Sequence, residues 1–260
     1  MAEQDWEKLG EGADPSWYLD PLVARQKREV NLALVQAALR YAPNPQRVLK
    51  TDLFEDAFGE DELLGEFPVS PRLLCGVELA FSTTQRAQSR FPHLRGQLAV
   101  GDLRNLPFRP GSFDLIVSTS SLDHFATVEE WEGALLGLLK LLAPGGVALL
   151  TFDNPANPLY HCLRWGARLG LLPFALGFTP NLETVERRAV AAGYTVLSQS
   201  FAIYNPRGLS TALFLGLRKL LGGRADGAVR WCLQAFAKLG KTGLRRRFAC
   251  FHASILQAPD

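Results

Sequence analysis

Short apolar runs alternating with helix-length segments constrain the fold of this chain more than any other feature. Three such runs lie in the middle of the chain: Gln97–Val100, Phe113–Val117 and Val147–Phe152. Parallel strands need long crossovers, usually helices, so this alternation is typical of an α/β fold with a parallel sheet. Asp102 follows the first run, and the Pro-Gly-Gly sequence of Pro144–Gly146 opens the last.

The same pattern continues on both sides of this region. Before it, the sequence predicts strands at Arg47–Phe54 and Leu73–Ala80. Three segments have apolar residues at helical spacing: Trp17–Tyr41, Thr83–Phe91 and Val128–Leu142. Beyond residue 153 we expect, in order, apolar helical pieces at Asn157–Phe178, a helix at Asn181–Ala192, a strand at Tyr194–Phe201, a helix at Leu209–Leu239 broken near Gly222–Gly223, and a strand at Arg247–Gln257.

The composition is that of an ordinary globular chain. With 260 residues, 47% hydrophobic and 21% charged, there is enough chain for one large core. Four widely spaced cysteines without a Cys-x-x-Cys pair argue against a zinc site or a disulfide framework, and we expect no metal. The acidic N-terminus lacks an apolar core, and every long apolar stretch is interrupted. These features predict a cytoplasmic protein without a membrane span.

The ordered set of segments resembles the class I S-adenosylmethionine-dependent methyltransferases. The resemblance is carried by Leu106–Ser118 (LPFRPGSFDLIVS) and Leu141–Gly146 (LLAPGG), which stand at the spacing of successive strand–helix units. It implies a Rossmann-like doubly wound, mainly parallel seven-stranded sheet with an antiparallel last strand and helical inserts. We therefore expect a single domain over residues 1–260, with an N-terminal helical cap (1–45), a cofactor-binding core (46–153) and substrate-side helices and strands (154–260).

The resemblance implies S-adenosylmethionine as cofactor and points to two acidic residues that follow strands. A carboxylate at Glu78 can accept two hydrogen bonds from ribose hydroxyls, and one at Asp102 can accept a bond from the adenine amino group. Leu79, Leu103 and Ser118 are the neighbouring candidates for cofactor contact. The alternative interpretations are an acid favoured by a helix start for Glu78 and a turn or cap residue for Asp102.

The first strand departs from the family pattern. Where the family has a sequence like VLDLGCGTG, this chain has Lys50 in place of the usual acid and Asp52 in place of the first glycine. Asp tolerates a left-handed backbone better than most residues, so the turn can survive. We expect Asp52 to meet the amino group of the cofactor and Lys50 or Thr51 its carboxylate. The alternative is a non-catalytic fold relative, a binding or regulatory protein that has lost the cofactor.

Candidate catalytic residues follow the fourth strand. Methyl transfer from a sulfonium needs mainly alignment, and a base helps only when the acceptor must lose a proton. Asp123 and His124 are candidates for that base, and His161 is a further one. The alternative is a helix-capping Asp and structural histidines.

The apolar segments expected on the substrate side of the domain predict a small or lipid-like acceptor. The apolar inserts Leu159–Phe178 and Leu209–Leu239, with Trp17 and Tyr18, would roof such a pocket. After Tyr204 there are ten lysines and arginines but only two acidic residues. This basic part is a candidate for peripheral membrane contact, with a solvated helix face as the alternative. The near-neutral net charge of +2 and the lack of a Gly-x-Gly-x-x-Gly motif argue against nucleic-acid and dinucleotide partners.

Overall fold

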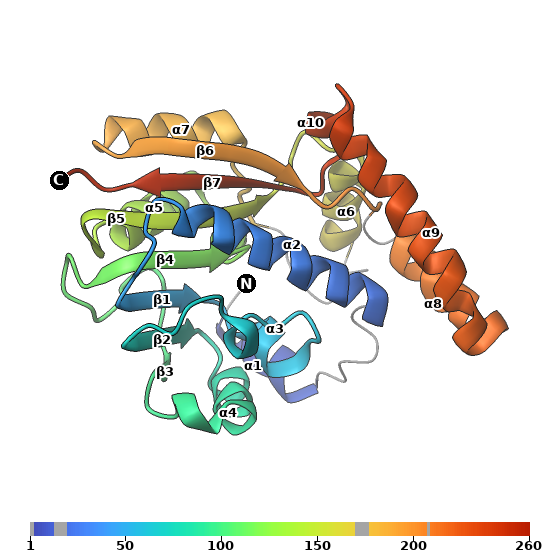
Figure 1. The fold of residues 1–260 in the computed structure, drawn as a ribbon, viewed down its shortest axis with the longest axis horizontal. Coiled ribbons are helices and arrows are strands. Elements are labelled where there is room, and N and C mark those ends of the chain that lie inside the picture. The colour runs from blue at the N-terminus through green and yellow to red at the C-terminus, as the bar shows by residue number, and fades with distance from the viewer. Residues whose placement is uncertain (1–2, 13–19, 170–176, 207–208) are drawn as a thin grey trace.

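The computed structural model describes residues 3–12, 20–169, 177–206 and 209–260 (Figure 1). Its seven-stranded sheet has the order β3-β2-β1-β4-β5-β7-β6. The strands are β1 (Arg47–Thr51), β2 (Leu73–Glu78), β3 (Leu98–Val100), β4 (Phe113–Thr119), β5 (Leu142–Asp153), β6 (Thr195–Ala202) and β7 (Phe251–Gln257). β1 to β5 pair in parallel, and β7 runs antiparallel between β5 and β6. The predicted fold class is confirmed, including the antiparallel last strand.

Helices cover both faces of this sheet. In chain order the helices are α1 (Glu3–Gly12), α2 (Pro21–Leu39), α3 (Phe54–Phe58), α4 (Phe81–Arg90), α5 (Val128–Leu139), α6 (Pro158–Arg168), α7 (Leu182–Ala191), α8 (Leu209–Leu221), α9 (Ala225–Ala237) and α10 (Arg245–Phe248), of which α8 and α9 lie beyond the edge of the sheet. On one face Trp131 and Leu135 of α5 pack with Ile116 of β4, and on the other Val35 of α2 packs with Leu115. The two apolar layers leave the sheet buried on both sides, as a parallel sheet requires.

The predicted boundaries needed correction at the first and fifth strands. β1 ends at Thr51 and not at Phe54, because residues from Phe54 onward form α3. β5 begins at Leu142, so Pro144–Gly146 lies inside the strand as an irregularity in its pairing with β4 and does not open it. The last strand begins at Phe251, since residues 245–248 form α10.

The structure differs from the sequence-based expectation at the N-terminus and agrees with it near Gly222–Gly223. The helix α1 was missed, because its short acidic segment carries few apolar residues to give a periodic signal. The break near Gly222–Gly223 is confirmed: a 3-10 turn there separates α8 from α9. The predicted roof residues Trp17 and Tyr18 lie outside the described residues, as does part of the insert Leu159–Phe178.

Candidate functional site

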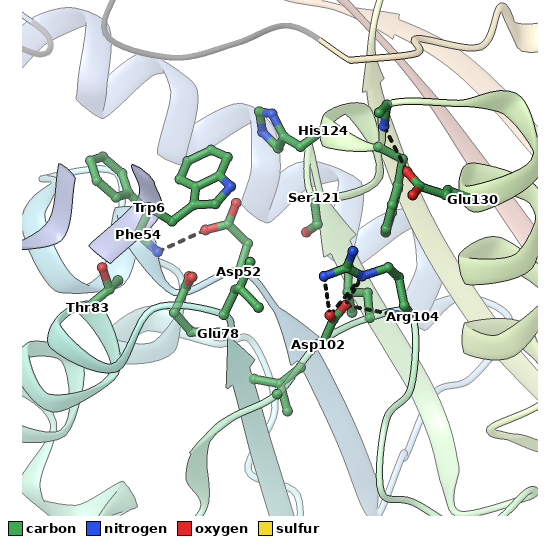
Figure 2. A pocket seen from close by; sticks show the side chains of 16 residues that line it. Trp6, Asp52, Phe54, Glu78, Thr83, Asp102, Arg104, Ser121, His124 and Glu130 are labelled. Atoms are coloured by element: carbon green, nitrogen blue, oxygen red, sulfur yellow. Dashed lines mark hydrogen bonds and ion pairs between the residues drawn. The ribbon is translucent and has the colours of Figure 1, made fainter. Parts of the chain in front are cut away.

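A cavity of about 200 Å³ opens beside the carboxyl ends of β1, β2 and β3 (Figure 2). In this strand order the connections reverse direction between β1 and β4, and ligands of open parallel sheets bind at that edge. The cavity receives side chains from the loops that follow four strands and from α1. Of the predicted cofactor residues, Asp52, Glu78, Leu79, Asp102 and Leu103 line it.

Glu78 ends β2 and is 9% exposed. Its Oε2 accepts the Leu53 N–H at 2.9 Å, and its Oε1 accepts the Ala80 N–H at 3.1 Å. Burial raises the pKa of Glu78, although these hydrogen bonds favour its charged form. The carboxylate therefore fixes the loop after β1 and the chain that leads into α4, and it has more acceptor positions than these two bonds use.

Asp52 makes the turn that leaves β1. Its φ of 65° is left-handed, as predicted for this position, and its Oδ1 accepts the Phe54 N–H at 2.9 Å. Burial, and next the negative charge of Glu78, raise the pKa of Asp52 to about 7. Asp52 and Glu78 thus bring two carboxylates to one wall of the cavity, where a cation would relieve their repulsion.

Lys50 does not point into the cavity. Its ammonium is fully buried and pairs with Asp56 of α3, with 2.6 Å between Nζ and Oδ2, and it also donates to the backbone carbonyl of Asp52. Burial alone would lower the pKa of Lys50, but Asp56, Glu55 and Asp52 together raise it. The expectation that Lys50 reaches a ligand carboxylate does not fit this geometry, because the charge is already neutralised inside the protein.

Thr51 and Ser118 are also buried and do not line the cavity. The hydroxyl of Thr51 lies 2.9 Å from the Ser118 hydroxyl and 2.7 Å from that of Ser121. Ser121 does line the cavity. The two predicted residues therefore tie the ends of β1 and β4 together and position Ser121, a contact residue that the sequence did not single out.

Asp102 follows β3 and is held by Arg104. Its Oδ1 accepts the Arg104 backbone N–H at 2.9 Å, which is the turn predicted as the alternative, and its Oδ2 lies 2.6 Å from the guanidinium Nη2. Burial alone would raise the pKa of Asp102, but the hydrogen bonds from Arg104 outweigh it and lower the pKa. Asp102 is thus an ionised acceptor at the cavity, with Arg104 as a partner that was not foreseen.

The upper wall comes from α1 and the turn after β4. The rings of Trp6 and His124 meet edge to face, with 4.7 Å between their centroids (Figure 2). Glu7 anchors α1, because its carboxylate accepts the N–H groups of Phe81 and Ser82 at 2.8 and 2.9 Å, at the start of α4. Phe54 also lines the cavity, so an aromatic ring stands where the family pattern has a glycine.

The two catalytic candidates are placed differently. His124 lines the cavity, whereas Asp123 is buried, and its Oδ2 accepts the Asp153 N–H at 2.7 Å. Asp123 therefore fastens the turn that carries His124 to the end of β5. The alternative of a capping role for Asp123 is wrong, because Thr127 caps α5 through a 3.2 Å bond from the Glu130 N–H.

Two further features of the described residues bear on function. Nowhere in the described parts of the chain do three His, Cys, Asp or Glu residues gather in an arrangement that could hold a metal ion. Of the helices described, none is long and apolar enough to cross a membrane.

Comparison with protein families gives a match over residues 59–150, to the model described as a methyltransferase domain. Residues 59–150 belong to a methyltransferase domain. The matched region starts at Gly59 and ends in β5, so it contains Glu78 and Asp102 but not the turn at Asp52.

A curated relative matches a short part of this chain. The tRNA (carboxymethyluridine(34)-5-O)-methyltransferase alkbh8 of Xenopus tropicalis is 45% identical over 51 residues, which are 20% of this chain. The matched region spans only 8% of the length of that relative.

Solved structures share the fold of the methyltransferase domain over nearly its whole length. The N-methyltransferase NodS from Bradyrhizobium japonicum WM9, in complex with S-adenosylhomocysteine, matches with a TM-score of 0.61 and 17% identity, covering 99% of each chain. A methyltransferase from Thermotoga maritima, described as a possible histamine N-methyltransferase, has a TM-score of 0.59 and 14% identity, covering 98% of this chain and 99% of its own.

The residues of the cavity fit S-adenosylmethionine. The carboxylates of Glu78 and Asp102 offer acceptors for hydroxyl and amino groups, between the apolar side chains of Leu79 and Leu103. Asp52 offers a negative charge where a cationic end would lie. Arg104, which is ion-paired with Asp102, is the cation among the residues lining the cavity.

Proposed function

We propose that the methyltransferase domain holds its cofactor in the cavity beside Glu78 and transfers the methyl group to a small or lipid-like acceptor. The observation that carries this proposal is the convergence of Asp52, Glu78 and Asp102 on one cavity whose other walls are aromatic and aliphatic. Carboxylates at the ends of successive strands, combined with apolar surfaces, are what a ligand with a ribose, an aromatic base and a cation requires.

Glu78 would accept the ribose hydroxyls, and Asp102 would accept the adenine amino group. Glu78 is well oriented for this, because its two backbone hydrogen bonds fix the carboxylate plane. The Asp102 carboxylate has a side-chain exposure of 34%, so it remains accessible beside Arg104. Asp52 would face the positively charged methionine end, since its Oδ1 bond to Phe54 keeps the carboxylate next to Glu78.

S-adenosylmethionine, when bound, supplies a methyl group activated by a positively charged sulfur. The protein would contribute alignment and exclusion of water. Trp6 and Phe125 form apolar walls near His124, and α1 is attached over this wall through Glu7. A covered apolar site favours a direct displacement, because the positive charge of the donor is dispersed in the transition state. Water would stabilise the charged donor more than this transition state.

His124 is the candidate base for an acceptor that must lose a proton. Its imidazole lines the cavity, and histidine titrates near neutral pH. Asp123 would act as a positioning residue, since it holds the His124 turn through the Asp153 N–H. Replacing His124 by Asn would then lower kcat with protic acceptors and flatten the acidic limb of the pH profile.

A small or lipid-like acceptor is supported by the shape and chemistry of the site. Apolar side chains, among them Trp6, Phe54 and Phe125, line the cavity beside the carboxylates, which favours an acceptor with a hydrophobic part. One solved structure with this fold is described as a possible histamine N-methyltransferase, which is consistent with a small amine acceptor. The shared 51 residues with a tRNA methyltransferase lie in one fifth of the chain and favour no particular acceptor.

A methyl-transfer assay with a panel of amines, phenols and single-chain lipids tests the proposal. We expect turnover with at least one member and its loss in Glu78→Gln, whereas Glu66→Gln, a substitution at a half-exposed carboxylate outside the cavity, should retain it. Cofactor binding without turnover on any member would contradict the proposed acceptor class and favour a binding protein. Turnover on a transcribed tRNA alone would also overturn it.

A further inference from the structure

The helix α8 has two apolar sides next to each other, and only one of them is covered. Phe214 and Leu217 pack with Val23 of α2 and with Val229 and Leu233 of α9. The neighbouring side carries a stripe of leucines at helical spacing, with exposed fractions of 64% for Leu209, 50% for Leu213 and 82% for Leu220. Exposed bulky apolar side chains in one row are unusual on a water-facing helix and mark a contact surface.

The segment around this stripe is strongly basic. Between residues 209 and 248 there are nine lysines and arginines and a single acid, Asp226. Lys219 and Arg224 are exposed beside Leu220, at the tip where α8 turns into α9. The adjoining α9 exposes Trp231 at 70%. The segment therefore combines positive charge with exposed leucine and tryptophan, although the whole chain has a net charge of only +2.

The pair α8 and α9 is firmly attached to the domain. Arg218 of α8 pairs with Asp20, which caps α2, and with Asp226 of α9. Figure 1 shows the pair beyond the edge of the sheet to which the carboxyl ends of the parallel strands point. The exposed stripe therefore belongs to a fixed surface on the same edge as the proposed methyl-transfer site.

We propose that the α8–α9 pair docks on a membrane surface that contains anionic phospholipid. The leucine stripe and Trp231 would enter the boundary between headgroups and acyl chains, while Lys219 and Arg224 contact lipid phosphates. A nucleic acid would use the basic residues but not the leucines, and a second copy of this surface would be repelled by its own charge. An anionic bilayer satisfies both properties together.

Vesicle flotation tests this docking without any cofactor or acceptor, so its result is independent of the proposed function. The full chain should float with phosphatidylcholine vesicles that contain about 30 mol % phosphatidylglycerol, and far less with phosphatidylcholine alone. The double variant Leu213→Ser/Leu220→Ser should bind at least about tenfold more weakly, because two leucines no longer enter the apolar boundary. Lys219→Glu/Arg224→Glu should lose the preference for the anionic vesicles.

Val190→Ser is the matched control, since Val190 is a 54% exposed apolar residue on α7, remote from this stripe. All variants replace exposed side chains, and circular dichroism should show unchanged helix content. No flotation of the full chain with anionic vesicles, or equal flotation of the leucine variant and the control, would overturn the proposal. So would a leucine variant that alters only self-association, because the stripe would then bind a second copy.

Discussion

Lys50 and Asp56 form an ion pair that is fully buried between β1 and α3, with 2.6 Å between Nζ and Oδ2. Lys50 stands where the methyltransferase family pattern has an acid, and Asp56 supplies the opposite charge six residues later. The same ammonium donates to the carbonyl of Asp52, the residue with left-handed backbone. The turn at the cofactor cavity is therefore held by an internal charge pair in place of glycines.

Breaking this pair on one side should destabilise the protein strongly. Lys50→Met leaves the Asp56 carboxylate buried without its partner, which typically costs about 3–5 kcal/mol of unfolding free energy. Urea unfolding followed by circular dichroism measures this loss. The double variant Lys50→Met/Asp56→Leu should recover part of it, because no lone charge remains. A single variant that loses less than about 1 kcal/mol would contradict the role of the pair.

Asp52→Asn should stabilise the folded protein at pH 8. In the unfolded chain the carboxyl titrates near its ordinary value, and in the folded protein its pKa is raised to about 7. The folded state then binds more protons between these values, so stability falls as pH rises through this window. Asn removes the buried charge, keeps an acceptor for the Phe54 N–H and tolerates the left-handed backbone.

Differential scanning fluorimetry of the wild type and Asp52→Asn checks this stability effect. The melting temperature of the variant should exceed that of the wild type at pH 8, and the difference should shrink towards pH 5. Asp52→Ala serves as the matched control, since it removes the charge but also the turn contact. A variant less stable than the wild type at pH 8 would contradict a raised pKa at Asp52.

Cofactor affinity should rise with pH through the same group. A cationic ligand prefers the ionised Asp52, so protonation below a pKa of about 7 competes with binding. For one competing proton, affinity at pH 6 should be about tenfold lower than at pH 8. Fluorescence titration with S-adenosylmethionine at both pH values measures the ratio. In Asp52→Asn the ratio should approach one, and an unchanged ratio would assign the pH dependence to another group.

Trp6→Ala should weaken cofactor binding, because an aromatic wall of the cavity is lost. The expected increase in the dissociation constant is about tenfold, from the contact area of one partly covered ring. Trp6→Phe should retain most of the affinity. Calorimetry of both variants decides whether the Trp6 ring of α1 contacts the cofactor or obstructs the site. Equal or tighter binding by Trp6→Ala would mean that the ring obstructs the site and does not line it.

Local patterns in the sequence predicted the sheet and part of the cavity. The parallel α/β sheet follows from apolar runs separated by helix-length segments, whereas its antiparallel last strand came from the family resemblance. Glu78 and Asp102 could be placed because acids end or directly follow two of those runs. The left-handed turn at Asp52 was likewise accessible, since few residue types tolerate it.

Contacts between distant segments could not be predicted from local sequence patterns. The direction of the Lys50 side chain depends on how α3 packs under β1, and no spacing rule reports it. Trp6 reaches the cavity only because Glu7 caps α4, a contact between residues more than seventy positions apart. Arg104 was missed for a different reason: an exposed arginine near an acid is common and carries little signal alone.

Isothermal titration calorimetry with S-adenosylmethionine tests the central claim most directly, that the cavity beside Glu78 is the cofactor site. The wild-type protein should bind one S-adenosylmethionine per chain. In Glu78→Gln binding should weaken at least about tenfold, because charge-assisted hydrogen bonds to the ribose are lost. The matched variant Glu66→Gln should bind like the wild type. No binding heat from folded wild-type protein at millimolar S-adenosylmethionine, or equal affinity in Glu78→Gln, would contradict it.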